Sequence, residues 1–230
     1  MKHINLSFAA CGFLGIYHLG AASALYRHGR KLLKDVKAFA GASAGSLVAT
    51  VLLTAPERIE ECNEFTYKFA EEIRRQSFGA LTPGYDFMAR LRSGMDLILP
   101  ANAHELAHNR LHVSITNTKT RQNYLVSKFS SREDLIKVLL ASSFLPIYAG
   151  VKPVEYNGQD CSLRLPPPPP ALQAGGRERE REGGKGELIP AICSQAGLWA
   201  SSSLPSAAAA VKVHYPTYPP SLAPAYRRTL

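Results

Sequence analysis

The stretch Val36-Lys37-Ala38-Phe39-Ala40-Gly41-Ala42-Ser43-Ala44-Gly45-Ser46-Leu47 decides the fold. Residues 36–40 are apolar and β-prone, residues 41–45 carry only small side chains, and residues 46–54 are almost wholly apolar. The order predicts a strand, a sharp turn and a helix. One βα unit is therefore complete by residue 54.

A second βα unit precedes it. Residues 4–9 form a short apolar run, and the glycine-containing segment Cys11-Gly12-Phe13-Leu14-Gly15 follows. Apolar side chains then recur at helical spacing from Ile16 to Leu25. Two successive βα units predict an α/β fold with a mainly parallel central sheet covered by helices.

Further elements follow downstream. Residues 57–75 predict an amphipathic helix, which we expect to pack on the sheet because its polar face is mostly acidic. Residues 86–99 predict another helix, and residues 111–115 and 123–129 predict two half-buried, paired strands. Ser130, three residues before Glu133, predicts a capping box for a helix that ends near Ser143.

The composition changes near Asp160. Eleven of the 16 prolines follow residue 160, and the same segment holds a run of five prolines, two glycine pairs and an alternating Arg/Glu stretch. Such a segment lacks the apolar periodicity needed to bury a core. We predict a folded domain over residues 1–160 and a disordered, Pro/Gly/Ala/Ser-rich tail over residues 161–230.

The net charge, the apolar content and the cysteine spacing limit the kinds of partner that we expect the chain to bind. The formal charge of +9 attracts anionic surfaces, but no groove-reading helix or basic-aromatic cluster favours nucleic acid. No stretch is apolar for the roughly 20 residues of a membrane span, so we expect peripheral membrane contact. The four widely spaced cysteines have no metal-ligand spacing and predict buried or free thiols in a reducing compartment.

The pentapeptide Gly41-Ala42-Ser43-Ala44-Gly45 is a G-x-S-x-G motif between a strand and a helix. A serine hydroxyl becomes an effective nucleophile when a strained turn presents it beside small residues and a helix N-terminus. Ser43 is the candidate nucleophile on this pattern. The alternative is that the glycines only permit a tight turn and that Ser43 caps the next helix.

The first glycine loop, residues 11–15, can supply backbone N–H groups to an oxyanion. A dinucleotide-binding loop is a weaker interpretation, because Ala10 replaces the leading glycine of G-x-G-x-x-G. A phosphate-binding P-loop is excluded, because residues 41–46 contain no lysine.

The two glycine loops together resemble the patatin-like phospholipase family. The segments Leu140-Ala141-Ser142-Ser143-Phe144 and Pro146-Ile147-Tyr148-Ala149-Gly150 are also similar to it. The resemblance runs from about His3 to Gln159. It implies a patatin-like three-layer sandwich and a Ser-Asp dyad without histidine, with no metal and no cofactor, so His104, His108, His112 and His214 need no catalytic role.

The resemblance also implies a serine acyl hydrolase that cleaves triacylglycerols, phospholipids or retinyl esters. It implies a cytoplasmic protein peripheral to membranes or lipid droplets, with mitochondria as the alternative compartment.

The pattern breaks where the dyad aspartate should lie. The family carries it in an Asp-Gly-Gly or Asp-Gly-Ala turn, and this sequence contains no Asp-Gly dipeptide. Asp160 is the nearest carboxylate, but Cys161 follows it, so the role is not assigned to Asp160. The expected function is an acyl hydrolase of weak or lost turnover, with a non-catalytic lipid-binding or lipid-droplet-associated variant as the alternative.

Overall fold

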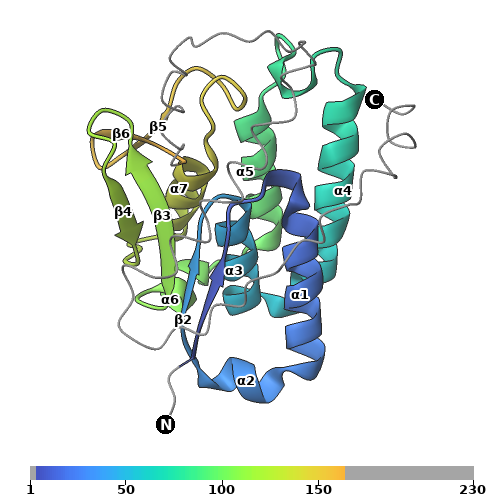
Figure 1. Cartoon of the computed structure of the whole chain (residues 1–230), viewed down its shortest axis with the longest axis vertical. Coiled ribbons are helices and arrows are strands. Elements are labelled where there is room, and N and C mark those ends of the chain that lie inside the picture. The colour runs from blue at the N-terminus through green and yellow to red at the C-terminus, as the bar shows by residue number, and fades with distance from the viewer. Residues whose placement is uncertain (1–3, 164–230) are drawn as a thin grey trace, which may run out of the picture.

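The computed structural model describes residues 4–163, which fold into an open α/β sheet flanked by helices (Figure 1). The sheet order is β1-β2-β3-β6-β5, with β4 also paired to β3. The strands β1, β2 and β3 run parallel, and β4, β5 and β6 join antiparallel. The strands are β1 (Ile4–Phe8), β2 (Val36–Gly41), β3 (Leu111–Asn117), β4 (Asn123–Val126), β5 (Val154–Tyr156) and β6 (Gln159–Ser162).

The helices form layers on this sheet. The α-helices are α1 (Gly15–His28), α2 (Arg30–Asp35), α3 (Ala44–Thr54), α4 (Ile59–Arg75), α5 (Phe87–Ile98), α6 (Ala103–Ala107) and α7 (Arg132–Ser143). Three short 3-10 helices are η1 (Gly12–Leu14), η2 (Pro56–Arg58) and η3 (Gly79–Leu81). Helices α3 and α7 pack directly against the strands, α1 packs on α3, and α4 bridges α1 and α5. Among residues 4–163, no helix has the length and apolar character needed to cross a membrane.

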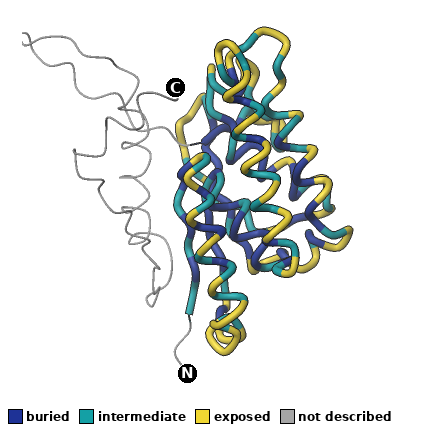
Figure 2. The backbone as a smooth tube through the Cα atoms, turned by 90° about the vertical axis from the view of Figure 1, so that its right-hand side faces the viewer, coloured by how far each residue is buried: buried dark blue, intermediate teal, exposed yellow. Residues whose placement is uncertain are grey.

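The core lies between the sheet and these helices (Figure 2). Its centre is strand β3, together with the inner faces of α3 and α7. The prediction of a half-buried strand was wrong for β3, because both of its faces are covered and six of its seven residues are buried. The sequence of β3 nevertheless alternates between apolar and polar residues. Its polar residues Ser114, Thr116 and Asn117 are small enough to be buried as well.

The sequence placed the start of α7 one residue too early. Ser131, not Ser130, is the N-cap, and its hydroxyl accepts a hydrogen bond from the N–H of Asp134 at 3.1 Å. The Asp134 carboxylate in turn accepts from the N–H and the hydroxyl of Ser130. Two adjacent serines satisfy the pattern equally well, so local sequence could not choose between them.

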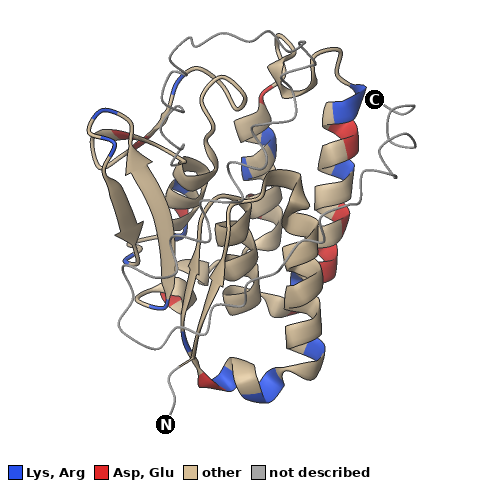
Figure 3. Ribbon diagram, viewed as in Figure 1, with Lys and Arg blue, Asp and Glu red and all other residues tan. Residues whose placement is uncertain are grey.

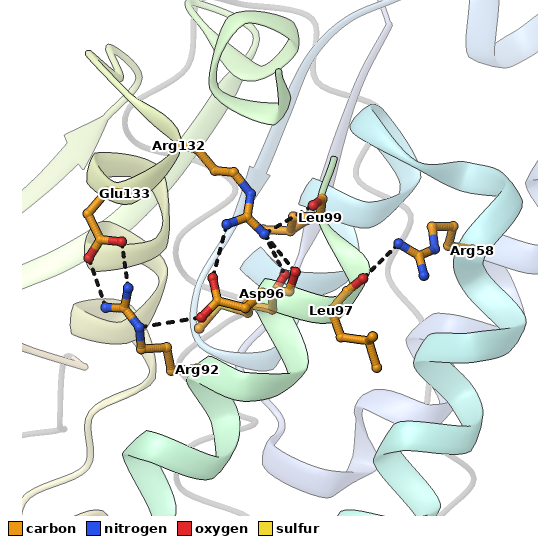
Figure 4. A network of polar contacts seen from close by, with 8 residues as sticks. Arg58, Arg92, Asp96, Leu97, Leu99, Arg132 and Glu133 are labelled. Atoms are coloured by element: carbon orange, nitrogen blue, oxygen red, sulfur yellow. Dashed lines mark hydrogen bonds and ion pairs between the residues drawn. The ribbon is translucent and has the colours of Figure 1, made fainter. Parts of the chain in front are cut away.

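Arginines fasten α5 to its neighbours (Figure 4). Arg132 on α7 donates to the carbonyls of Asp96 and Leu99 at 2.8 and 3.1 Å, and Arg58 donates to the carbonyl of Leu97 at 2.7 Å. These carbonyls lie at the C-terminal end of α5, where a helix lacks intrahelical donors. Arg92 adds a two-bond ion pair to Glu133. The network holds α5 in a fixed position between η2 and α7.

At Gly45, helix α3 lies directly against the end of β1. A Cβ atom at Gly45 would lie 2.3 Å from the carbonyl oxygen of Phe8. Because that neighbour is backbone, we expect Gly45→Ala to lower the free energy of unfolding by about 3 kcal/mol or more. Urea unfolding measures the change.

The matched control is Gly20→Ala on α1, where a Cβ would meet nothing within 4 Å. Alanine is the better helix former, so this variant should be neutral or up to about 1 kcal/mol more stable. Equal effects of the two substitutions would contradict the close approach of α3 to β1.

Candidate active site

Ser43 lies at a sharp bend between β2 and α3. Its backbone has φ 52° and ψ −132°, a conformation that L-residues rarely adopt and that costs free energy. The glycines on either side make the bend sterically possible, since a Cβ at Gly41 would lie 2.5 Å from the Cα of Ser46. This is the geometry that a G-x-S-x-G turn needs to lift a serine above the end of a sheet.

A buried hydrogen-bond relay holds the bend in place. The N–H of Ser43 donates to the hydroxyl oxygen of Ser142 on α7 at 2.8 Å, and that hydroxyl donates to the carbonyl of Ser114 on β3 at 2.7 Å. Ser142 has no exposed surface. The relay thus couples the bend to a second helix and to the central strand. No sequence pattern predicts a role for Ser142, because residues 43, 114 and 142 meet only in the folded chain.

The interpretation of Ser43 as a helix cap is not supported by its contacts. Ser43 occupies the N-cap position of α3, yet its side chain forms no cap hydrogen bond. Its carbonyl accepts instead from the N–H and the hydroxyl of Ser46, at 2.8 and 2.6 Å. In the described part of the chain, the Ser43 hydroxyl has no hydrogen-bond partner.

The first glycine loop lies beside this bend. Residues 12–14 form η1, which continues directly into α1, and a Cβ at Gly15 would lie 3.2 Å from the Cβ of Ala44. The first N–H groups of a helix have no acceptor within that helix, so the amides of Gly12 and Phe13 are available there. The structure therefore brings together the two motifs that the sequence separates by about thirty residues.

His18 contacts the residues that directly precede this loop. Its buried ring donates from Nε2 to the carbonyl of Ala9 at 3.1 Å and packs edge-on against Phe8. Burial lowers the pKa of His18 below its ordinary value of 6.5, so the ring is neutral at physiological pH. A neutral ring satisfies the carbonyl at the end of β1 without placing a charge in the core.

An apolar cavity of about 640 Å³ opens beside Ser43. Its volume is in the range of small-molecule sites, roughly 300–1,000 Å³. Helices α1, α3, α4, α5 and α7 all contribute to its wall. Lining residues that the sequence did not mark as a site include Phe65, Phe69, Leu91, Met95 and Leu139.

Helix α4 supplies one wall of the cavity, which corrects the expected packing of this helix on the sheet. The helix packs on α1 and α5 instead. Its apolar stripe at Cys62, Phe65 and Phe69 faces the cavity. Burial there raises the pKa of Cys62 to about 12, so its thiol is protonated and unreactive at neutral pH.

No carboxylate or imidazole lines the cavity within residues 4–163. Asp160 lies on β6, where its carbonyl accepts from the N–H of Thr118 at 2.9 Å, and it is not a lining residue. His104, His108 and His112 are not lining residues either, and His214 lies outside the described residues. The predicted tail, apart from Cys161–Leu163, also lies outside them.

The family model for patatin-like phospholipases matches residues 6–179. The chain belongs to the patatin-like phospholipase family. Patatin-like phospholipase domain-containing protein 4 of Homo sapiens is 87% identical over 159 residues, which are 69% of this chain and 63% of that protein. The chain therefore spans less than two thirds of this family member.

Less similar family members match the same part of this chain. Patatin-like phospholipase domain-containing protein 2 of Mus musculus is 38% identical over 67% of this chain and 32% of its own length. The 1-acylglycerol-3-phosphate O-acyltransferase PNPLA3 of Homo sapiens is 35% identical over the same shares. Among solved structures, VipD from Legionella pneumophila superposes with a TM-score of 0.42 and 15% identity, over 71% of this chain and 46% of that one.

Ser142→Ala tests the relay. The substitution leaves the Ser43 N–H buried without an acceptor, which should lower the free energy of unfolding by about 1–3 kcal/mol. We also expect the Ser43 amide proton, protected from exchange in the unaltered chain, to exchange much faster in the variant. Denaturant unfolding and amide hydrogen exchange by NMR measure the two effects.

The neighbouring residue provides the control. The hydroxyl of Ser143 is buried but has no hydrogen-bond partner in the described part of the chain. Ser143→Ala should therefore change stability by less than about 0.5 kcal/mol and leave Ser43 exchange unaltered. A Ser43 amide that exchanges equally fast in both variants would show that Ser142 does not hold the bend.

Proposed function

We propose that the chain is a serine acyl hydrolase of lipid esters, with Ser43 as nucleophile and with turnover that is weak or lost. The observation that carries the proposal is the position of Ser43, on a strained bend that opens into an apolar cavity. Membership of a family that includes phospholipase-domain proteins and an acyltransferase supports lipid-ester chemistry.

The cavity suits an acyl chain. Its lining carries no charged side chain within the described residues, and each buried methylene of a ligand gains roughly 0.8 kcal/mol. An ester bound with its chain along α3 and α5 can place its carbonyl near Ser43 and the backbone of residues 11–15, because these residues line the same cavity. Triacylglycerols, phospholipids and retinyl esters all present such a carbonyl.

The chemistry follows from the groups at that end. Attack by the Ser43 Oγ on the ester carbonyl forms a C–O bond and moves the π electrons onto the carbonyl oxygen. The amides of Gly12 and Phe13, with that of Ala44 at the start of α3, are donors for this oxyanion. Departure of the alcohol leaves an acyl-serine, and water then releases the fatty acid and restores the hydroxyl.

The step that lacks a catalytic group in this cycle is the removal of the proton from the Ser43 hydroxyl. A general base must remove it during attack, and no carboxylate of residues 4–163 lines the cavity. Loss of one member of such a catalytic unit typically costs about 10⁴ to 10⁶ in rate. We therefore propose residual acyl transfer at most, at the surface of a membrane or lipid droplet.

The second candidate is a non-catalytic lipid-binding protein. The same observation favours it: the apolar cavity is formed, but no base lies beside the hydroxyl in the described residues. Such a protein would take up fatty acids or lipid esters without cleaving them. Ser43→Ala would then leave binding of a fluorescent fatty acid unchanged.

Reaction with a fluorophosphonate probe tests the catalytic proposal. We expect slow labelling of the unaltered chain, none in Ser43→Ala, and labelling that is faster by orders of magnitude in a version that ends with an Asp-Gly-Gly segment. Mass spectrometry locates the adduct. Hydrolysis of a p-nitrophenyl ester should follow the same order.

Ser46→Ala serves as the matched control, because Ser46 is a buried serine of the same turn whose hydroxyl donates only to the Ser43 carbonyl. It should keep the labelling that Ser43→Ala loses. Ester hydrolysis at equal rates with and without the Ser43 hydroxyl would refute the assignment of the nucleophile.

A further inference from the structure

Large exposed hydrophobic side chains occur on three segments that contain or adjoin residues lining the cavity beside Ser43. Six of the eleven such side chains in the described part of the chain lie on these segments. We call these six residues the rim: Leu14, Tyr17, Phe78, Leu81, Ile147 and Val151. They belong to the η1–α1 junction, to the loop between α4 and α5, and to the loop between α7 and β5 (Figure 1).

A chain of aromatic contacts joins the three segments. The ring of Phe13 packs on Phe69 with centroids 5.4 Å apart, Phe69 on Phe87 at 5.0 Å, and Phe87 on Tyr148 at 5.4 Å. All four rings line the cavity beside Ser43. Each rim segment thus contains or adjoins a cavity-lining ring.

The three most exposed large hydrophobic side chains of residues 4–163 belong to the rim. Val151 is 93% exposed, Ile147 74% and Phe78 72%. Groups of exposed apolar side chains on soluble domains mark sites of contact with a partner or a membrane. Leu14 and Tyr17 are both exposed and part of the cavity lining, so the rim includes the cavity mouth.

Positive charge borders the rim. Lys152 follows Val151 and has no ion-pair partner among residues 4–163, and Arg75 ends α4 close to Phe78. Figure 3 shows basic residues at this upper end of α4. Of the nearby acids, Glu71 pairs with Arg75 at 3.6 Å, Glu72 pairs with Arg90 at 2.8 Å and Asp86 caps α5, whereas Glu155 on β5 is exposed.

We propose that the rim docks on the surface of an anionic phospholipid bilayer. The rim side chains enter the interface, the bordering cations face the lipid phosphates, and the cavity mouth opens toward the acyl chains. The apolar surface supplies the burial, and each cation near an anionic surface adds attraction. This docking face rests on the proposed function: it is the face through which a lipid ester would reach Ser43.

Vesicle co-sedimentation of the full chain tests it. Phosphatidylcholine vesicles containing phosphatidylserine should bind the chain more tightly than phosphatidylcholine alone, and added salt should weaken that difference. Replacing Phe78 and Val151 together by serine should lower the partition coefficient about tenfold or more. Thermal unfolding checks that the variant is folded.

The control replaces Tyr67 and Leu97 by serine. These residues are 62% and 63% exposed, on α4 and α5, but they are not part of the rim. Binding should be unaltered. Equal losses in the two double variants, or a rim variant that binds as the unaltered chain does, would overturn the proposal. So would a rim variant that only converts a dimer to a monomer in sedimentation equilibrium, since the occupant would then be a second copy.

Ser43→Ala separates docking from catalysis. The substitution removes the proposed nucleophile and leaves the rim intact, so vesicle binding should persist in it. Rim-dependent binding without probe labelling, in both the unaltered chain and the version that ends with an Asp-Gly-Gly segment, would refute Ser43 as nucleophile and retain the docking face. Labelling of Ser43 without rim-dependent binding would support the hydrolase and refute the docking face.

Discussion

The backbone of Ser43 is held in a left-handed conformation by a buried hydrogen bond from its N–H to the hydroxyl of Ser142. An isolated serine would leave that conformation, so the surrounding fold must stabilise it. Ser142 passes the constraint on to the Ser114 carbonyl of β3, and Gly45 lets α3 sit directly on the end of β1. The sheet, α3 and α7 are thereby fixed around one residue, and the cavity forms between those helices and α1, α4 and α5.

Local sequence predicted those elements whose determinants lie within a few residues. The strand-turn-helix around Ser43, the glycine loop at residues 11–15 and the mainly parallel arrangement of β1, β2 and β3 follow from small residues and apolar periodicity. The Ser142 relay and the cavity wall on α4 depend on contacts between distant segments. Periodicity identified the apolar face of α4 but could not say whether a sheet or a cavity lies against it.

The cavity and the proposed nucleophile are formed in residues 4–163 without a carboxylate or imidazole beside them. An apolar cavity, a presented hydroxyl and the amides of the glycine loop are all formed by residues 4–163, whereas no carboxylate or imidazole of those residues lines the cavity. In the docking that we propose, the rim would meet the bilayer beside the cavity that Ser43 lines.

We propose that an acyl chain fills the cavity with its carboxyl end at Ser43. Methyl-labelled methionine reports on it directly, because Met95 lines the cavity and Met88 does not. Titration with a fatty acid should shift the Met95 methyl signal and the amide signals of Gly12 and Phe13, and leave Met88 in place. Saturable binding that moves none of these three signals would place the lipid elsewhere and contradict the account.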